Sequence, residues 1–335
     1  MEKILSISIA AYNAENDISR CLESLICSGV LEQLDIIVVN DGSQDNTADI
    51  VKTYEEKYRN SIRLINKENG GHGSTINTSI QYAIGKYYKI LDSDDWVDSE
   101  NLSKLVKYLE NIDVDLVLNP YREVDYNDHT KTKLYNPVNY KGDEGKKLSL
   151  DRLTADIILY MHSLTFRTNV IKQMGSIIDE NCFYVDMEYC VFPLQYIDSF
   201  AYLDYPIYQY LLGSQTQSMN QINLIKRRNQ HLKVTKRLVE FYSSHSQNVN
   251  MQIKALMAFR IKYAIYQQYK IYLSMPAREA IGEIKEFDSW LDKNAGDLYV
   301  GPKGHVMQYI KLNRKLNFRG YVLLTNIMNR FGFIK

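Results

Sequence analysis

Apolar and polar positions along the first hundred residues follow a pattern that predicts four strands separated by helices. Residues 4–10 alternate apolar and small positions, as a strand does. Three further runs rich in branched or aromatic residues predict strands at 35–40, 62–65 and 87–91. Between these runs, apolar residues recur at helical spacing and polar turns supply helix starts. The order predicts an α/β fold, Rossmann-like, with a mostly parallel central sheet flanked by helices.

The pattern becomes mixed after Asp98 and later changes to helices alone. Short runs predict a helix at 101–109, a strand at 115–119, a tyrosine-rich hairpin within 121–140, helices at 148–160 and up to Met174, and strands at 200–203 and 207–212. From about residue 224, helical spacing prevails, and we expect the apolar and aromatic stripe at 253–272 to be core. We therefore predict a first domain at 1–218, with halves 1–98 and 99–218, and a helical region at 219–335.

The last segment is a basic appendage on a mildly acidic chain. Residues 300–335 contain seven Lys or Arg and no Asp or Glu, so residues 1–299 hold 33 basic and 40 acidic residues. The segment is also rich in leucine and aromatic residues, which predicts a basic amphipathic tail. Two interpretations remain open. The tail lies on an anionic membrane surface, or it packs on the body of the protein or in a homo-oligomer interface.

Composition excludes several other classes of protein. With 45% hydrophobic and 24% charged residues, the chain has an ordinary globular composition. Its net charge of zero gives no overall case for nucleic-acid binding. No apolar run approaches the roughly 18 residues that a membrane-spanning helix needs. The six histidines are scattered without metal-ligand spacing, which argues against zinc. The four cysteines form no CxxC pair and Met1 leads straight into a strand pattern, so we expect a cytoplasmic protein, peripheral at the inner membrane face if the tail binds lipid.

The stretch LDSDDW at 91–96 carries the clearest candidate chemistry. Three carboxylates follow directly on a predicted strand, and α/β folds bind ligands at the carboxyl ends of their strands. Carboxylates at this spacing suit a hard divalent cation together with the phosphates or hydroxyls of its nucleotide. Asp41 follows the second strand, so we expect it to meet Asp92 and Asp94 in one crevice. The alternative is an ordinary acidic loop in which Asp98 or Ser99 caps the next helix.

A glycine-rich loop, NGGHGS at 69–74, is expected to flank that crevice. Glycine allows backbone amides to approach a ligand closely, although a plain turn explains the same residues. Two nucleotide-binding classes are disfavoured. The first strand is followed by Ala11-Tyr12-Asn13 rather than GxGxxG, which argues against a dinucleotide dehydrogenase, and the absence of GK[ST] argues against a P-loop protein.

Three segments, in the same order and at matching spacing, resemble the family-2 glycosyltransferases. They are SISIAAYNAE at 6–15, VNDGSQDNT at 39–47 and LDSDDW at 91–96. These relatives are inverting, nucleotide-sugar-dependent enzymes of GT-A fold, and the resemblance covers about residues 4–218. It implies a GT-A-like first domain, a UDP-sugar as donor and Mn²⁺ or Mg²⁺ as the metal.

The resemblance also implies roles for individual residues. Tyr12, Glu15 and Asp41 would surround the base, with Asp41 accepting a hydrogen bond from the uracil imide N–H. Asp92 would face the ribose, and Asp94 would bind the metal that holds the diphosphate. The full nucleotide-sugar site implied in this way consists of Ala11, Tyr12, Asn13, Glu15, Asp41, Asn69, Gly71, Asn77, Asp92 and Ser93.

Asp186 is the implied general base, because FYVDMEY at 183–189 matches the place where the family carries it. Glu188 is the second candidate, and the alternative to both is that either acid only caps the helix leading into Cys190. The usual Glu-Asp pair of the family is Val185-Asp186 here.

Two other positions depart from the family pattern. Ala11 stands where a proline often precedes Tyr-Asn, and Ile76 where an arginine often precedes the asparagine of the third helix. Ile76 cannot supply the phosphate contact of that arginine. His72 is either its substitute or an ordinary surface or capping histidine.

We therefore hypothesise an inverting glycosyltransferase that moves a sugar from a UDP-sugar to a hydroxyl of a glycan or lipid-linked glycan, in bacterial cell-surface polysaccharide synthesis. The alternative is a non-catalytic member of the same fold that binds a nucleotide sugar or docks on a partner enzyme.

Overall fold

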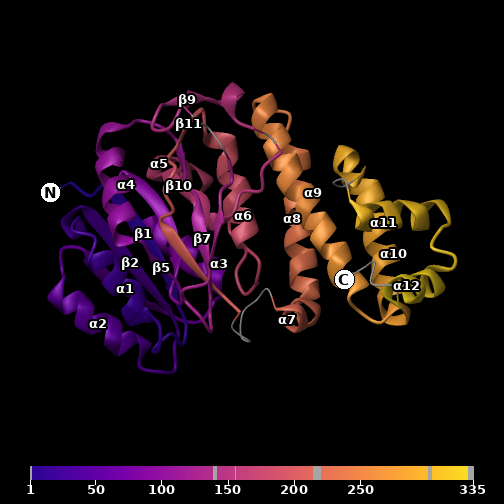
Figure 1. The fold of residues 1–335 in the computed structure, drawn as a ribbon, viewed down its shortest axis with the longest axis horizontal. Coiled ribbons are helices and arrows are strands. Elements are labelled where there is room, and N and C mark those ends of the chain that lie inside the picture. Colours follow the sequence, from indigo (N-terminus) through magenta and orange to yellow (C-terminus); the bar gives the residue numbers. More distant parts are fainter. Residues whose placement is uncertain (1, 139–141, 155, 214–219, 301–303, 331–335) are drawn as a thin grey trace. The chain divides into compact units, whose positions relative to one another are not determined.

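The computed structural model describes residues 2–138, 142–154, 156–213, 220–300 and 304–330, and the chain divides into two compact units (Figure 1). Unit 1 consists of Met1–Thr154 and Leu159–Ser214, and unit 2 of Ala155–Ile158 and Gln215–Lys335. The predicted domain boundary at 218/219 falls outside the described residues.

Unit 1 is built on an eight-stranded sheet in the order β3-β2-β1-β4-β10-β6-β11-β9. The strands are β1 (Leu5–Ala11), β2 (Leu34–Asp41), β3 (Ile62–Lys67), β4 (Tyr87–Asp92), β6 (Leu116–Leu118), β9 (Leu148–Ser149), β10 (Leu164–Arg167) and β11 (Ser199–Tyr202). The four N-terminal strands are all parallel, and antiparallel pairing begins where β10 meets β4. The predicted α/β class and the four N-terminal strands are confirmed.

Helices cover both faces of this sheet. They are α1 (Ile18–Ile26), α2 (Thr47–Lys57), α3 (His72–Tyr82), α4 (Ser99–Asn111), α5 (Thr168–Met174) and α6 (Asp186–Val191). The alternation in β1 decides which helices lie on which face. Ile7 and its apolar neighbours pack with Leu22 of α1 and Leu105 of α4, whereas Ser8 donates to Ser79 of α3 at 2.7 Å. Because successive strand residues point to opposite faces, α1 and α4 lie across the sheet from α3.

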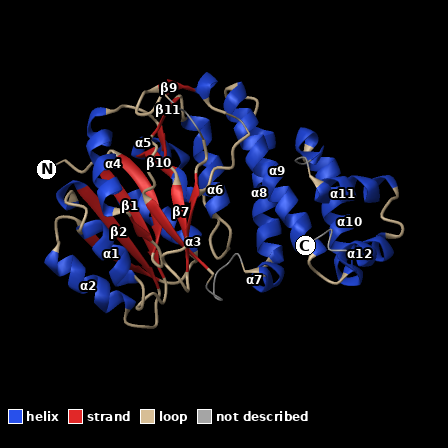
Figure 2. Cartoon of the chain, viewed as in Figure 1, coloured by secondary structure: helices blue, strands red, loops and turns tan. Residues whose placement is uncertain are grey.

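A second sheet of four strands, β5-β12-β7-β8, completes unit 1 (Figure 2). Its strands are β5 (Trp96–Val97), β7 (Tyr121–Asp125), β8 (Thr132–Tyr135) and β12 (Tyr208–Leu212). β7 and β8 form the antiparallel hairpin that the sequence predicts, and β12 pairs with both β7 and β5. This sheet brings β12 beside the residues that follow Asp92.

The predicted helix at 148–160 is wrong. Leu148 belongs to β9 and pairs with Phe200 of β11, and a short 3₁₀ turn follows at Leu150–Arg152. Leu148 and Leu150 are two positions apart and both buried, which is the spacing of an edge strand rather than of a helix face. Tertiary pairing with β11 therefore outweighs the weak helical pattern.

Unit 2 is helical, as predicted. Its helices are α7 (Gln221–Lys226), α8 (Arg228–His245), α9 (Met251–Leu273), α10 (Ala277–Asn294), α11 (His305–Lys315) and α12 (Tyr321–Arg330). The stripe predicted to be core lies in α9, where Leu256, Ile261 and Ile265 are fully buried. Among the described residues, no helix combines the length and apolar character that crossing a bilayer requires.

One side of the basic tail packs within unit 2 and the other is exposed. Arg314 of α11 lies in an ion pair with Asp288 of α10, with Nε 2.7 Å from Oδ1, and its guanidinium sits 3.8 Å from the ring centre of Tyr299. Leu312 and Leu316 point outward instead, with exposed fractions of 48% and 43%. The tail residues Lys303, Phe331, Phe333 and Lys335 lie outside the described part of the chain.

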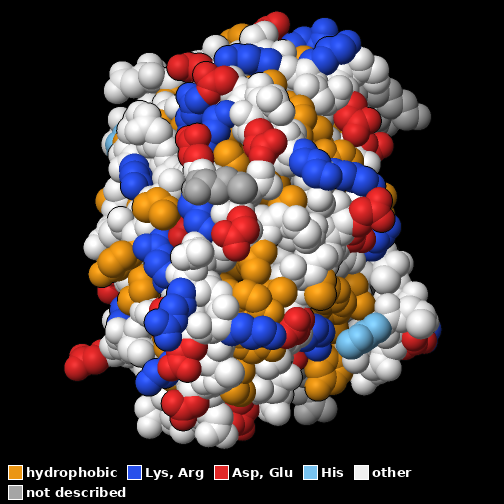
Figure 3. All heavy atoms as spheres, turned by 90° about the vertical axis from the view of Figure 1, so that its left-hand side faces the viewer, with side chains coloured by type: hydrophobic (Ala, Val, Ile, Leu, Met, Phe, Trp, Pro, Cys, Tyr) orange, Lys and Arg blue, Asp and Glu red, His pale blue; other side chains and the backbone are white. Residues whose placement is uncertain are grey.

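The face of the molecule that Figure 3 shows is mixed in charge. Lysine and arginine side chains are interspersed with aspartate and glutamate over this face, which carries no continuous basic area.

Candidate active site

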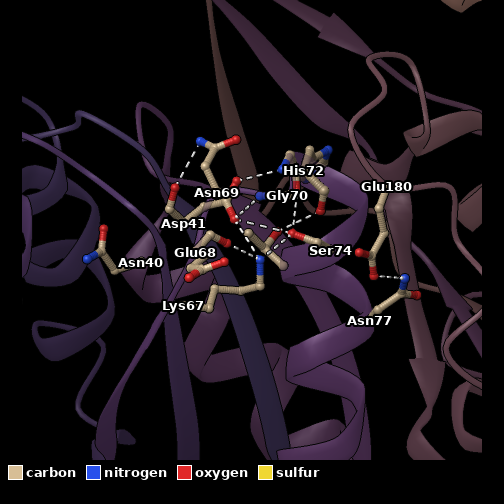
Figure 4. A network of polar contacts seen from close by, with 12 residues as sticks. Asn40, Asp41, Lys67, Glu68, Asn69, Gly70, His72, Ser74, Asn77 and Glu180 are labelled. Atoms are coloured by element: carbon tan, nitrogen blue, oxygen red, sulfur yellow. Dashed lines mark hydrogen bonds and ion pairs between the residues drawn. The ribbon is translucent and has the colours of Figure 1, made fainter.

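Asp41 at the end of β2 is buried and holds the glycine loop in place (Figure 4). Its Oδ1 accepts from Gly70 N at 2.9 Å and from Lys67 Nζ at 3.0 Å, and its Oδ2 accepts from Gly71 N at 2.7 Å. The Ser74 hydroxyl adds a longer contact at 3.2 Å. A buried carboxylate needs such partners, so Asp41 organises the loop. Its contact with a uracil N–H stays a prediction.

Glycine is required at two positions of this loop. Gly71 has a φ of +80°, a left-handed conformation that side-chain-bearing residues rarely adopt. A Cβ on Gly73 would lie 1.9 Å from the carbonyl oxygen of Asp179. The first turn of α3 therefore lies directly against the segment that precedes α6. Asn181 N, in that segment, also donates to Gly70 O at 2.5 Å.

The residues predicted around the base connect the loops after β1 and β2. Asn13 Oδ1 accepts from Gln44 N at 2.8 Å, and Glu15 Oε2 accepts from Asn46 N at 3.1 Å. Asn13 adopts a positive φ of 51°. Tyr12 has 53% of its surface exposed, so its ring is accessible to a ligand.

Asn77 and Asn69 make contacts within the protein. Asn77 Nδ2 donates to Ile178 O at 2.8 Å and to Glu180 Oε1 at 3.0 Å, and its Oδ1 accepts from Ile178 N at 3.1 Å (Figure 4). Asn69 is exposed and its Nδ2 donates to the Asp41 carbonyl at 2.9 Å. Asn77 thus fixes α3 to the segment before α6. Its contact with the nucleotide sugar, like that of Asn69, stays a prediction.

The predicted acids at the end of β4 lie in one electrostatic environment with Asp186. Burial raises the pKa of Asp92 to about 6, and the charges of Asp94 and Asp186 act in the same direction. His72 opposes them, with Nε2 3.5 Å from Asp92 Oδ1. Asp94 is exposed, whereas Ala11 and Ser93, the other predicted residues at these strand ends, are buried. The fold therefore brings Asp186 of α6 near the motif after β4.

Asp186 and Glu188 differ in their surroundings. Glu188 is fully buried, and its Oε2 accepts from Asp179 N at 2.8 Å. Asp186, in the first turn of α6, is only partly buried. Its carboxylate can be reached from solvent, which a general base acting on an incoming acceptor requires.

Asp95 fastens the acidic loop to β12. Its Oδ2 accepts from the Tyr208 hydroxyl at 2.6 Å and its Oδ1 from Leu211 N at 2.7 Å, while the same hydroxyl accepts from Asp92 N at 3.1 Å. Burial, with the charges of Asp94 and Asp92, raises the pKa of Asp95 well above its usual range.

Asp98, in contrast, caps α4 and also lies 3.8 Å from Arg122 in an ion pair. Its carboxylate accepts from Asn101 N at 3.0 Å, as the alternative interpretation of the acidic loop expected for this residue.

Tyr210 is a site residue that the sequence did not reveal. Burial raises its pKa, and the charges of Asp95, Asp92, Asp186 and Asp94 raise it further. The charges of all four acids therefore act on this phenol. The alternation of tyrosines in β12 is the only sequence signal that marks it.

His162 and Lys89 are two further residues that the motifs did not mark. His162 lies in a 3₁₀ turn before β10, where one ring nitrogen and carboxylate oxygens of Asp92 and Asp95 all lie within 4.8 Å of one another. Burial and the charge of Lys89 lower its pKa to about 3, so the ring is neutral. Lys89 is itself buried, which lowers its pKa to about 7, and its Nζ donates to His162 O at 2.8 Å and to Leu164 O at 3.1 Å.

Comparison with known proteins gives this site its context. Residues 6–172 match the model of the family described as Glycosyl transferase family 2. This chain belongs to that family. The predicted family and the GT-A-like fold are confirmed.

Three similar proteins illustrate the match. Glycosyltransferase GlyA of Streptococcus pneumoniae is 32% identical over 117 residues, and a poly(ribitol-phosphate) beta-glucosyltransferase of Bacillus spizizenii is 37% identical over 118. These alignments cover 35% and 34% of this chain but only 16% and 18% of the relatives' own lengths. The crystal structure of S. aureus TarS 1–349 in complex with UDP-GlcNAc shares the fold, with a TM-score of 0.53 and 16% identity over 92% of each chain.

Proposed function

We propose that this family-2 glycosyltransferase is an inverting enzyme that transfers a sugar from a UDP-sugar to a hydroxyl of a glycan acceptor in bacterial cell-surface polysaccharide synthesis. The observation that carries the proposal is that the charges of Asp94 and Asp186 both act on the carboxylate of Asp92. The names of similar proteins support donor and acceptor class: one is solved with UDP-GlcNAc and another acts on poly(ribitol-phosphate).

Asp186 is the general base in this proposal. Its carboxylate takes the proton of the acceptor hydroxyl while the acceptor oxygen forms its bond to the anomeric carbon. The bond between that carbon and the diphosphate breaks, and UDP leaves on the opposite face. General base catalysis of this kind contributes typically about 10²–10⁴-fold.

The site suits a divalent cation. Its carboxylates are hard oxygen donors, and the raised pKa values of Asp92 and Asp95 reflect buried acids whose negative charge a cation would relieve. Mn²⁺ or Mg²⁺ bound here would supply Lewis-acid stabilisation of the departing diphosphate. Asp94, exposed beside Asp92, is the ligand that the motif predicts.

Peripheral membrane association is the second part of the proposal. Lys311, Leu312 and Lys315 of α11 are all exposed, and so is Leu316 directly after the helix. Basic and apolar side chains on one helix surface suit the boundary of an anionic bilayer. A lipid-linked glycan acceptor would be presented at such a surface.

Replacement of the base tests the catalytic role. Asp186→Asn should lower the rate of sugar transfer by about 10²–10⁴-fold, because the amide cannot accept the proton. Donor affinity, measured by calorimetric titration with UDP-GlcNAc, should not change. Asp198→Asn, at an exposed position, is the matched control and should transfer at the normal rate. Undiminished transfer by Asp186→Asn would contradict the proposal. Binding without turnover by the wild type, across donor and acceptor panels, would favour the non-catalytic alternative.

A further inference from the structure

The ring of His162 is held in one orientation by aromatic contacts. Tyr210 stacks on it with 4.3 Å between ring centres and an interplanar angle of 25°. Tyr208 and Tyr121 approach at 4.6 and 4.8 Å. Lys89 fixes the backbone of the same residue through its hydrogen bond to His162 O. A side chain restrained in this way is preorganised, as ligands of a binding site are.

This ring also has an unsatisfied polar atom. His162 is 8% exposed, and its Nδ1 has no hydrogen-bond partner among the described residues. Most buried polar atoms in proteins are paired, so an unpaired one requires an explanation. The neighbouring carboxylates of Asp92 and Asp95 suggest the explanation, because the three side chains place their ligand atoms within 4.8 Å of one another.

We propose that His162 is the nitrogen ligand of the cation site, acting together with Asp92 and Asp95, and that the site consequently selects Mn²⁺ over Mg²⁺. The inference rests on the proposed function, which leaves the choice between Mn²⁺ and Mg²⁺ open and names only Asp94 as a ligand; it adds His162, Asp92 and Asp95 to the coordinating residues.

The chemistry of the three side chains supports this assignment. A neutral imidazole offers a lone pair, whereas Mg²⁺ strongly prefers oxygen donors and parts reluctantly with its waters. Mn²⁺, a transition metal, accepts nitrogen more readily than Mg²⁺ does. Each oxygen of Asp95 accepts one hydrogen bond, from Tyr208 or Leu211, and an ionised carboxylate retains further lone pairs. Asp92 has a side chain 29% exposed, so it can face both the cation and a diphosphate.

The test is the electron spin resonance of bound Mn²⁺, read for both affinity and ligand type. Loss of the free-ion signal during titration gives the dissociation constant, and spin-echo modulation from ¹⁴N reports a coordinated imidazole. The wild type should show this modulation. His162→Phe fills the tyrosine-lined space without a ring nitrogen, so it should lose the modulation and bind Mn²⁺ about tenfold or more weakly. Competition with Mg²⁺ should show the preference for Mn²⁺ reduced by the same factor.

His72→Gln is the matched control, because His72 approaches the same Asp92 at 3.5 Å. It should retain the modulation. Loss of the ¹⁴N signal in His72→Gln but not in His162→Phe would overturn the proposal. A wild-type Mn²⁺ complex without ¹⁴N modulation would overturn it as well, independently of whether any variant folds. Sugar transfer from UDP-GlcNAc by the wild type is measured separately, so the glycosyltransferase assignment can survive either of these outcomes.

Discussion

We expect Asp92 to lower the stability of the unliganded protein at neutral pH. Because burial raises its pKa to about 6, the folded chain binds more protons than the unfolded chain between about pH 4 and 6. Stability contributed by this group is therefore lost as pH rises through that window. Asp92→Asn removes the effect, so at pH 8 the variant should be more stable than the wild type by about 3 kcal/mol. Below about pH 4 the two should be equal.

Urea denaturation at a series of pH values, without metal, checks this prediction. Asp198→Asn, an exposed control, should follow the wild type at every pH. Addition of Mn²⁺ should make the wild type more stable than Asp92→Asn, because a cation that binds only the folded wild type raises its stability. A difference between Asp92→Asn and the wild type that stays constant from pH 4 to 8 would contradict the account.

The residues of the site differ in how far the sequence could reveal them. Asp92 and Asp186 lie in short motifs, and the structure brings them near each other. His162 carries no local signal and only the alternating tyrosines of β12 mark Tyr210, because the turn before β10 and the strand β12 come from distant parts of the chain. The spacing of histidines in the sequence can reveal a metal site only when the ligands are close together in the chain. His162 is far from Asp92 and Asp95 in the sequence, so its spacing gives no information about the proposed site.

Among the secondary-structure elements, the start of α3 depends on close backbone contact. A Cβ on Gly73 would lie 1.9 Å from Asp179 O, so Gly73→Ala must displace either α3 or the segment before α6. We expect a loss of several kcal/mol in the free energy of unfolding, on the order of 2–4, despite the better helix propensity of alanine. Weaker donor binding should accompany it, because the glycine loop moves with α3.

Gly282→Ala in α10 is the control for that substitution. No atom lies within 4 Å of the added Cβ, so the change should raise stability by about 0.5–1 kcal/mol. Equal effects of the two substitutions, measured by urea denaturation, would show that the contact between Gly73 and Asp179 does not determine the position of α3.

The strands that the sequence predicts correctly are those whose pattern is set by burial on both sides of the sheet. Residues of β1 alternate because Ile7 faces α1 while Ser8 faces α3. The region at 148–160 has no such alternating pattern. Its first two residues form β9 by pairing with β11, which lies about 50 residues further along the chain. The sequence pattern did not predict the two-residue strand β5 either, because β5 is a strand only through its antiparallel pairing with the distant β12.

For the molecule as a whole, the proposed membrane role of the basic tail can be tested on α11. Lys311 and Lys315 are exposed, whereas Arg314 is already paired with Asp288. Each basic residue near an anionic membrane surface contributes about 1 kcal/mol, so the double variant Lys311→Glu/Lys315→Glu should bind phosphatidylglycerol vesicles at least about tenfold more weakly. Vesicle sedimentation measures this.

The control for membrane binding reverses two lysines elsewhere in unit 2. Lys285 and Lys293 of α10 are exposed, and Lys285→Glu/Lys293→Glu makes the same change in net charge. It should leave sedimentation with phosphatidylglycerol vesicles nearly unchanged. Equal loss in both double variants would indicate attraction by overall charge rather than by α11. Binding to neither anionic nor neutral vesicles by the wild type would remove the membrane role.

Calorimetric titration of the chain with UDP-GlcNAc, in the presence and absence of Mn²⁺, shows whether the acids after β4 form the nucleotide-sugar site. We expect saturable binding at one site per chain that requires the metal and is lost in Asp92→Asn. Because that variant should be the more stable protein at pH 8, its loss of binding could not be ascribed to unfolding. Donor binding that is unaffected both by removal of Mn²⁺ and by Asp92→Asn would contradict the claim that these acids form the nucleotide-sugar site.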